Sequence, residues 1–173
     1  MIETINERIR DLQKGNQEFI RKEKNLNKHV KGQNPKICVL TCSDSRVIPE
    51  FIFNKNIGEL FVVRVAGNVA IDESVITSLE YAVSHLQIFL LLILGHTNCG
   101  AIKAAEEADE VNGLLKEIKD SFKSDNHGLD NLKYQLKMLP KRSMLIKNAI
   151  KEKKIDFVGA IYNIENGKVD FLL

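Results

Sequence analysis

The stretch Ile88-Phe89-Leu90-Leu91-Leu92-Ile93-Leu94-Gly95-His96-Thr97-Asn98-Cys99-Gly100 decides the fold. Its first seven residues are all apolar, which is typical of a strand covered by other elements on both faces. The run is too short to cross a membrane, because a membrane span needs about 18 to 20 apolar residues. Polar and glycine residues follow directly. We therefore expect a buried strand over 88–94 that ends in a tight turn carrying a histidine and a cysteine.

Three other short apolar runs predict further buried strands, at residues 37–41, 60–65 and 155–161. Apolar residues at helical spacing predict helices between them and before them, over 2–23, 72–86, 101–108 and 129–151. The last of these helices should be interrupted near Pro140, because proline cannot donate the helical hydrogen bond. Residues 25–35 are typical of a loop, and residues 110–127 of a broken helix.

The order of these segments predicts an α/β fold. Strands that alternate with helices form a central, mostly parallel β-sheet with flanking helices. Asn166-Gly167 is a strong hairpin signal, so residues 168–172 should form an antiparallel strand at the C-terminal edge. We predict one domain over residues 1–173. Its N-terminal helix and arm, residues 1–35, should pack on a partner subunit, because the apolar face of helix 2–23 is long for a chain of this size.

Composition excludes several classes of protein. The chain has 173 residues, of which 44% are hydrophobic and 28% charged, as in an ordinary globular domain. A net charge of +2 argues against a dedicated nucleic-acid binder, and no segment is apolar for long enough to enter a membrane. The first ten residues lack the apolar stretch of a signal peptide, so we expect a cytoplasmic protein. Three cysteines in a reducing compartment suggest metal binding or catalysis.

Two thiols and an imidazole follow strands of the predicted sheet. Cys42 comes directly after the strand at 37–41, and His96 and Cys99 come after the strand at 88–94. Ligand sites in parallel sheets lie at the carboxyl ends of the strands. A Cys2His set suits Zn²⁺ and leaves a fourth position for water or substrate. The sequence therefore predicts one zinc ion per chain.

Asp44 and Arg46 follow Cys42 closely. Asp44 is near enough to be a fourth ligand or to lie just outside the ligands, and Arg46 can hold it in a bidentate ion pair. A carboxylate held in this way would orient a water molecule on the metal. The competing interpretation treats Cys42 and Cys99 as small buried apolar residues. Cys38 is expected in the core, because four residues of strand place it about 13 Å from Cys42.

The chain resembles the β-class carbonic anhydrases, in particular the compact prokaryotic members. The resemblance rests on Cys42-Ser43-Asp44-Ser45-Arg46 together with the Gly95–Gly100 stretch quoted above. It extends to Phe-Val-Val-Arg-Val-Ala-Gly-Asn at 61–68, Ser-Leu-Glu-Tyr-Ala-Val at 78–83 and the C-terminal segments 158–162 and 167–169. These matches span nearly the whole chain.

The resemblance implies a function, the reversible hydration of carbon dioxide to bicarbonate and a proton, by a zinc lyase. It implies that Cys42, His96 and Cys99 bind the zinc and that Asp44 and Arg46 are the catalytic pair. It implies a homodimer or a dimer of dimers, in which one residue of each chain reaches the neighbouring subunit's site. The substrate-binding residues that it implies are Gln33, which reaches that neighbouring site, Phe61, Ala66 and Tyr81 of an apolar pocket, and Gly100, whose N–H lies near bound substrate.

Three alternatives stay open at the level of sequence. A zinc hydrolase acting on COS or CS₂ would use nearly the same metal chemistry on the same scaffold. A non-catalytic protein that binds zinc or bicarbonate would have no need of Asp44, Arg46 and Gln33, so their presence argues against it. A thiol redox protein would use Cys42 and Cys99 without a metal, which a zinc determination would exclude.

Overall fold

The structure is a computed structural model that describes residues 4–23 and 25–172. The chain divides into two compact units, Met1–Gly32 and Gln33–Leu173. The single domain over 1–173, with an arm that packs on a partner subunit, stays a prediction.

The first unit contains one long helix, α1 (Ile5–Lys22), and a single turn of 3₁₀ helix, η1 (Leu26–His29). Thr4 begins α1 with a capping box: its hydroxyl accepts a hydrogen bond from the Glu7 N–H, and its own N–H donates to the Glu7 carboxylate at 2.7 Å. Residues 2 and 3, where the predicted helix begins, lie outside the described residues. The segment predicted as loop contains the η1 turn, which sequence reasoning missed.

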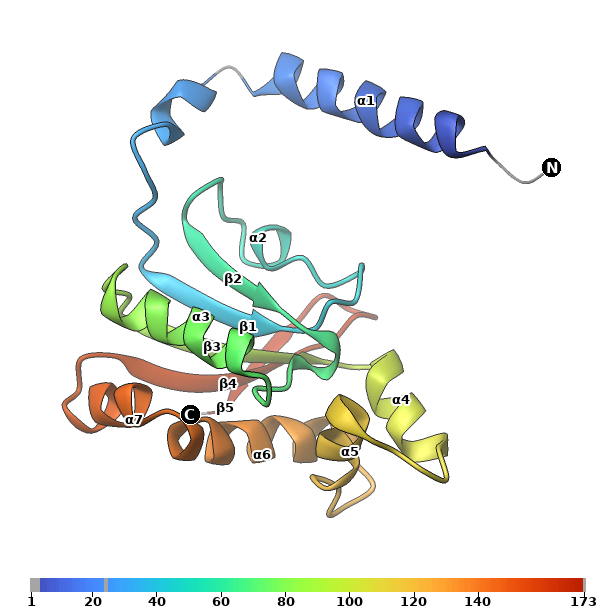
Figure 1. The fold of residues 1–173 in the computed structure, drawn as a ribbon, viewed down its shortest axis with the longest axis vertical. Coiled ribbons are helices and arrows are strands. Elements are labelled where there is room, and N and C mark those ends of the chain that lie inside the picture. The colour runs from blue at the N-terminus through green and yellow to red at the C-terminus, as the bar shows by residue number, and fades with distance from the viewer. Residues whose placement is uncertain (1–3, 24, 173) are drawn as a thin grey trace. The chain divides into compact units, whose positions relative to one another are not determined.

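The second unit is built on a five-stranded sheet in the order β2-β1-β3-β4-β5 (Figure 1). The first three pairings in that order are parallel and the β4–β5 pairing is antiparallel, which confirms the predicted fold class. The strands are β1 (Ile37–Thr41), β2 (Leu60–Arg64), β3 (Leu90–His96), β4 (Asp156–Tyr162) and β5 (Val169–Leu172). Strand β3 lies two residues later than predicted, so His96 ends the strand itself and does not belong to the following turn.

The sheet is covered on both faces by the same chain, as the apolar strands predict. Successive residues of β3 alternate between two cores: Leu91 and Ile93 pack on one face, and Leu92 and Leu94 on the other. The first face carries apolar side chains of three helices, which Figure 1 shows lying along one side of the sheet. These helices are α3 (Glu73–Ser84), α6 (His127–Arg142) and α7 (Met144–Lys151). Among the described helices, none is both long and apolar enough to cross a bilayer.

The remaining helices are short and lie near the carboxyl ends of the strands or in the long connection after β3. They are α2 (Pro49–Ile52), the η2 turn (Ala66–Asn68), α4 (Gly100–Glu107) and α5 (Gly113–Lys119). Helix α5 lies inside the segment predicted as broken helix. The predicted interruption near Pro140 falls three residues later, at Ser143, because α6 tolerates the proline in its last turn and the Ser143 hydroxyl accepts from the Ile146 N–H to begin α7.

The C-terminal hairpin forms as predicted, but its turn is longer than two residues. Tyr162 pairs with Val169, and the Asn163 N–H donates to the Lys168 carbonyl at 2.8 Å. Four residues therefore make the connection, with Gly167 at a φ of 75°, where a glycine meets the least steric resistance.

Candidate metal centre

The three predicted ligands converge at one end of the sheet. Because β1 and β3 are parallel neighbours, with Thr41 beside Leu94, the chain leaves both strands at the same edge. Donor atoms of Cys42, His96 and Cys99 all lie within 4.8 Å of one another, and all three residues are buried. The two sulfurs are 3.9 Å apart, well beyond the bond length of about 2 Å in a disulfide. The cluster has the size of a metal site with free thiols.

His96 presents an unpaired nitrogen to this cluster. Its Nδ1 lies 2.9 Å from the Thr97 carbonyl oxygen, which only accepts hydrogen bonds, so Nδ1 carries the proton. The lone pair is therefore on Nε2, which is buried and has no hydrogen-bond partner among the described residues. A buried polar atom without a partner is costly unless something else binds it. This tautomer and its anchoring carbonyl are those of a metal-binding histidine.

Each of the two neighbouring thiols influences the ionisation of the other. The Cys99 thiol beside Cys42 holds the pKa of Cys42 well below its usual range, with help from His96 and the Gly67 N–H, whose nitrogen lies 3.3 Å from the sulfur. The pKa of Cys99 is raised, first by Cys42 and then by burial, because a second buried anion would lie beside the first. A divalent cation removes this conflict. Two thiolates and one neutral imidazole thus fit Zn²⁺, with a fourth position left over.

Arg46 holds the carboxylate of Asp44 with three N–H groups. The guanidinium donates from Nε to Oδ1 at 2.9 Å and from one terminal nitrogen to Oδ2 at 2.7 Å, and the Arg46 backbone N–H reaches Oδ1 at 3.0 Å. These hydrogen bonds, the guanidinium pair first, lower the pKa of Asp44, so the group is ionised near neutral pH. Its Oδ2 lies 3.9 Å from His96 Nε2, beside the cluster. The predicted bidentate ion pair is present.

Two further groups support the loop at residues 42–46, and sequence reasoning missed both. Arg64, at the end of β2, donates to the carbonyls of Cys42 at 3.3 Å and Asp44 at 2.7 Å. The Asn98 carbonyl accepts from the Arg46 guanidinium at 3.0 Å. The position of Arg64 at the end of a strand next to β1 could have indicated that its side chain reaches this loop. Nothing in the sequence indicates the role of a backbone carbonyl.

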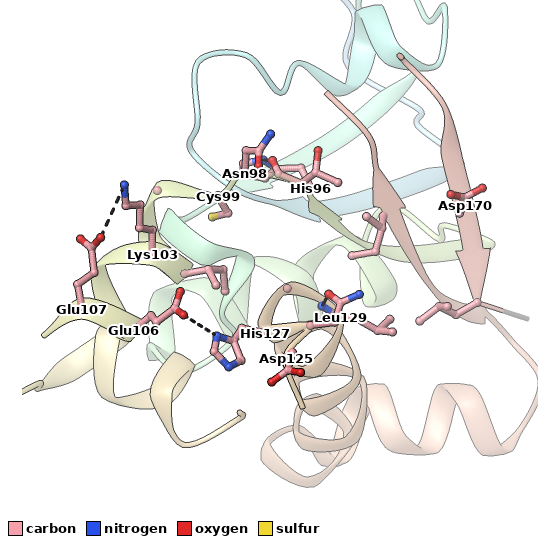
Figure 2. Close-up of a pocket in the computed structure, with 17 residues that line it drawn as sticks. His96, Asn98, Cys99, Lys103, Glu106, Glu107, Asp125, His127, Leu129 and Asp170 are labelled. Carbon is pink, nitrogen blue, oxygen red and sulfur yellow. Dashed lines mark hydrogen bonds and ion pairs between the residues drawn. The ribbon is translucent and has the colours of Figure 1, made fainter. Parts of the chain in front are cut away.

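An open cleft of about 1290 Å³ reaches the cluster from the side of α4 and α6 (Figure 2). His96, Cys99 and Gly100 lie along it, and His127 at the start of α6 faces Glu106 of α4, with Nδ1 3.8 Å from a carboxylate oxygen. His127 also stacks on Phe122, with ring centroids 3.9 Å apart. Nothing in the sequence indicated that His127 lies in the cleft, because Glu106 and Phe122, which it contacts, come from other segments.

The predicted substrate-binding residues fall into two groups. Gly100 lines the cleft, and Ala66 precedes Gly67, whose N–H meets the Cys42 sulfur. Phe61 pairs in register with Cys38, four residues before Cys42, so it lies about 13 Å back along the strand. Tyr81 packs on Phe61 with ring centroids 6.1 Å apart and is therefore also remote.

Gln33 is exposed just before the sheet begins. Within one chain, the structure brings together the ligands, the Asp44–Arg46 pair, Ala66 and Gly100, but not Phe61 or Tyr81.

Comparison with known proteins gives a family match over most of this unit. Residues 37–169 match the family model described as carbonic anhydrase. A carbonic anhydrase of Mycolicibacterium smegmatis is 31% identical, over 82% of this chain and 76% of the relative. Carbonic anhydrase 2 of Mycobacterium tuberculosis is 32% identical, over 79% of this chain and 74% of the relative.

Solved structures agree with the fold. The β-carbonic anhydrase of the fungal pathogen Aspergillus fumigatus superposes with a TM-score of 0.80 at 26% identity, covering 95% of this chain and 90% of that one. A Coccomyxa β-carbonic anhydrase in complex with acetazolamide gives 0.79 at 26% identity, with 99% and 87% covered.

Proposed function

The chain belongs to the β-carbonic anhydrase family, whose reaction is the reversible hydration of carbon dioxide to bicarbonate and a proton, and we propose that it carries out this reaction at the Cys42–His96–Cys99 cluster with one zinc ion per chain. The observation that carries the proposal is the unpaired, buried Nε2 of His96 facing two free thiols. A cation that joins these donors would satisfy all three of them at once. When bound there, zinc supplies the Lewis acidity that makes water a nucleophile near neutral pH.

In this proposal Asp44 and Arg46 are the catalytic pair. The three N–H groups on the Asp44 carboxylate keep it ionised and hold it beside the cluster, so that Oδ2 can accept a hydrogen bond from the attacking water. An oriented nucleophile loses less entropy on reaching the transition state. A protein that only bound zinc or bicarbonate would have no use for this pair, and the pair therefore favours the catalytic interpretation.

The substrate pocket is proposed to need a second copy of the chain. Phe61 and Tyr81 lie too far back along the sheet to reach the cluster of their own chain. If they line a carbon dioxide pocket, as the family resemblance implies, the cluster they serve is a partner's, as proposed for Gln33. Gly100 and Ala66 complete the pocket from the cluster's own chain. A fungal relative of the same fold from Sordaria macrospora is tetrameric, at 23% identity and a TM-score of 0.78.

We propose a homodimer or a dimer of dimers on this basis. The apolar face of α1 supports the same arrangement, because none of its residues is buried. A cytoplasmic location is proposed as well, since two free thiols that must bind metal suit a reducing compartment. Sedimentation across a range of protein concentrations tests the assembly, and cell fractionation tests the location.

The deciding experiment is stopped-flow hydration of carbon dioxide by the zinc-loaded protein, with COS and CS₂ assayed in parallel. We expect one zinc per chain by elemental analysis and rapid hydration of carbon dioxide only. Full zinc with turnover of COS or CS₂ instead would replace the proposed substrate. Full zinc with no turnover of any of the three would support a binding protein, and absence of zinc from an active thiol protein would support redox chemistry.

A further inference from the structure

A largely buried polar cluster lies beside the loop that contacts the metal centre. It consists of Glu117 of α5 with Asn131, Gln135 and Arg142 of α6. Glu117, Asn131 and Gln135 are 6%, 1% and 0% exposed. Sequence analysis assigned no role to any of them, and the reaction proposed above does not use them.

The cluster is fully hydrogen-bonded from end to end. Arg142 forms an ion pair with Glu117 at 2.7 Å. The Gln135 side-chain amide donates to both Glu117 and Asn131, each at 3.3 Å, and its oxygen accepts from the Ala70 N–H at 3.0 Å. Burying an ion pair and two amides brings little net stability compared with apolar packing. Their presence calls for a specific role.

The cluster donates hydrogen bonds to both ends of one loop, residues 67–70. Asn131 donates to the Gly67 carbonyl at 2.8 Å, while Arg142 donates to the Ala70 carbonyl at 2.8 Å. The opposite side of Gly67 faces the metal centre, where its N–H donates to the Cys42 sulfur. One residue therefore connects the buried cluster to a metal ligand.

Gly67 is held in a conformation that few other residues adopt. Its φ is +69°, and a Cβ atom there would lie 2.5 Å from the Ile118 side chain. The Gly67 N–H belongs to the 66–67 peptide and the Gly67 carbonyl to the 67–68 peptide, so Asn131 acts on the N–H through the Gly67 Cα. A change in the Gly67 backbone angles would turn its N–H away from the sulfur.

We propose that Asn131, Gln135, Glu117 and Arg142 are positioning residues, which hold the Gly67 N–H on the Cys42 sulfur and thereby set the metal affinity of the centre. An N–H donor withdraws electron density from a thiolate and fixes its direction. Groups that hold a metal ligand in this way typically change affinity by about 10- to 100-fold when they are removed. The inference rests on the proposed zinc site, and it adds a determinant more than one contact away from the ion.

The test compares Asn131→Leu with a control variant on the same helix, Leu132→Val. Leucine fills the space of the amide without donating to Gly67. Leu132 is fully buried in the apolar core and takes no part in the polar cluster. Zinc affinity is measured by competition with a chelator, at a temperature where circular dichroism shows each metal-free variant to be folded.

We expect Asn131→Leu to bind zinc at least tenfold more weakly than wild type, and Leu132→Val to bind it equally well. Cobalt substitution gives a second readout that stability alone does not move. Loss of the N–H donor leaves the sulfur richer in electrons, so the thiolate-to-cobalt charge-transfer band of Asn131→Leu should shift to longer wavelength. The band of Leu132→Val should stay where the wild-type band is.

Equal affinity and an unshifted band in Asn131→Leu would overturn the proposal, as would equal losses in both variants. If Asn131→Leu does not fold, Asn131→Ser replaces it, because the serine hydroxyl is too short to reach Gly67 and the change is small. The same weakening and band shift are then expected, and their absence counts against the proposal. Wild-type protein that binds no zinc would instead refute the proposed function itself.

Discussion

Helix α1 and strand β3 are both rich in large apolar residues, but their surroundings differ completely. Side chains of β3 are buried on both faces by the same chain, by helices on one face and mainly by loop residues and the short α2 on the other. In α1 no residue is buried, and Ile5 and Leu12 are 73% and 74% exposed. The apolar side chains of a strand in the middle of a sheet are thus buried by the same chain. An amphipathic helix with an exposed apolar face is suited to pack on another surface, as the proposed assembly requires.

The largest effect is expected inside the sheet unit, at the metal centre. Cys42→Ser should lose the bound zinc, most of the activity and much of the thermal stability together, because metal binding and folding are coupled. Cys38→Ser is the matched control on the same strand. Cys38 is fully buried in the apolar core, and this burial raises the pKa of its thiol to about 12. We therefore expect Cys38 not to bind the metal, and the Cys38→Ser variant should keep its zinc. Elemental analysis measures the outcome, and full zinc in Cys42→Ser would refute the ligand assignment.

The next effect concerns the Asp44–Arg46 pair. Removing the guanidinium in Arg46→Ala frees the Asp44 carboxylate, which then competes with water for the fourth metal position. Hydration of carbon dioxide should fall by about two to four orders of magnitude while the zinc content stays full. Asp44→Ala should fail differently, with the fourth position still open to anions. Stopped-flow rates and zinc absorption spectra separate the two variants, and near wild-type activity in Arg46→Ala would exclude this role for the pair.

The helix unit should govern assembly without changing the metal centre. Leu12→Lys places a charge on the apolar face of α1, whereas Gln17→Lys adds the same charge to its polar side. We expect Leu12→Lys to raise the subunit dissociation constant at least tenfold, which corresponds to about 1.4 kcal/mol. Sedimentation velocity from nanomolar to micromolar concentration measures this. Equal dissociation of the two variants would show that the apolar face makes no contact between chains.

The smallest expected effect is on thermal stability, and it concerns two carboxylates in the first turns of helices, one in each unit. Backbone N–H groups and hydroxyls lower the pKa of Glu7 in α1, mainly through Thr4, and that of Asp130 in α6, mainly through Lys123. A lowered pKa means that the ionised group stabilises the fold above its unfolded-state pKa. That contribution is lost as the pH falls through the folded-state value.

Asp130→Asn should therefore lower the midpoint of thermal unfolding by about 1 to 3 °C near pH 6, and the difference should vanish in acid. Glu7→Gln should leave the unfolding midpoint of the sheet unit unchanged, because α1 belongs to the other unit. Calorimetry between pH 2 and pH 6 measures both variants. A difference for Asp130→Asn that persists at pH 2 would contradict the assigned cause.

Local patterns predicted most of the sheet unit, because its strands are short, apolar and bounded by polar turns. Strand β1 begins and ends where the pattern places it, whereas β3 is shifted by two residues. Ile88 and Phe89 are as apolar as the strand that follows them, so hydropathy alone could not show where pairing with β1 begins. Tertiary pairing decides that boundary.

The sequence by itself determined which residues could form the candidate metal centre. Residue type and placement after strands identified Cys42, His96, Cys99, Asp44 and Arg46, because the carboxyl ends of parallel strands meet at one edge. Only the tertiary structure decided which groups support that site from behind: Arg64, which donates to two carbonyls, and Asn131, which donates to the carbonyl of Gly67, the residue whose N–H meets the Cys42 sulfur. Their hydrogen bonds join residues 20 to 64 positions apart. Contacts of this kind have no local periodicity, and they exist only once the helices have packed on the sheet.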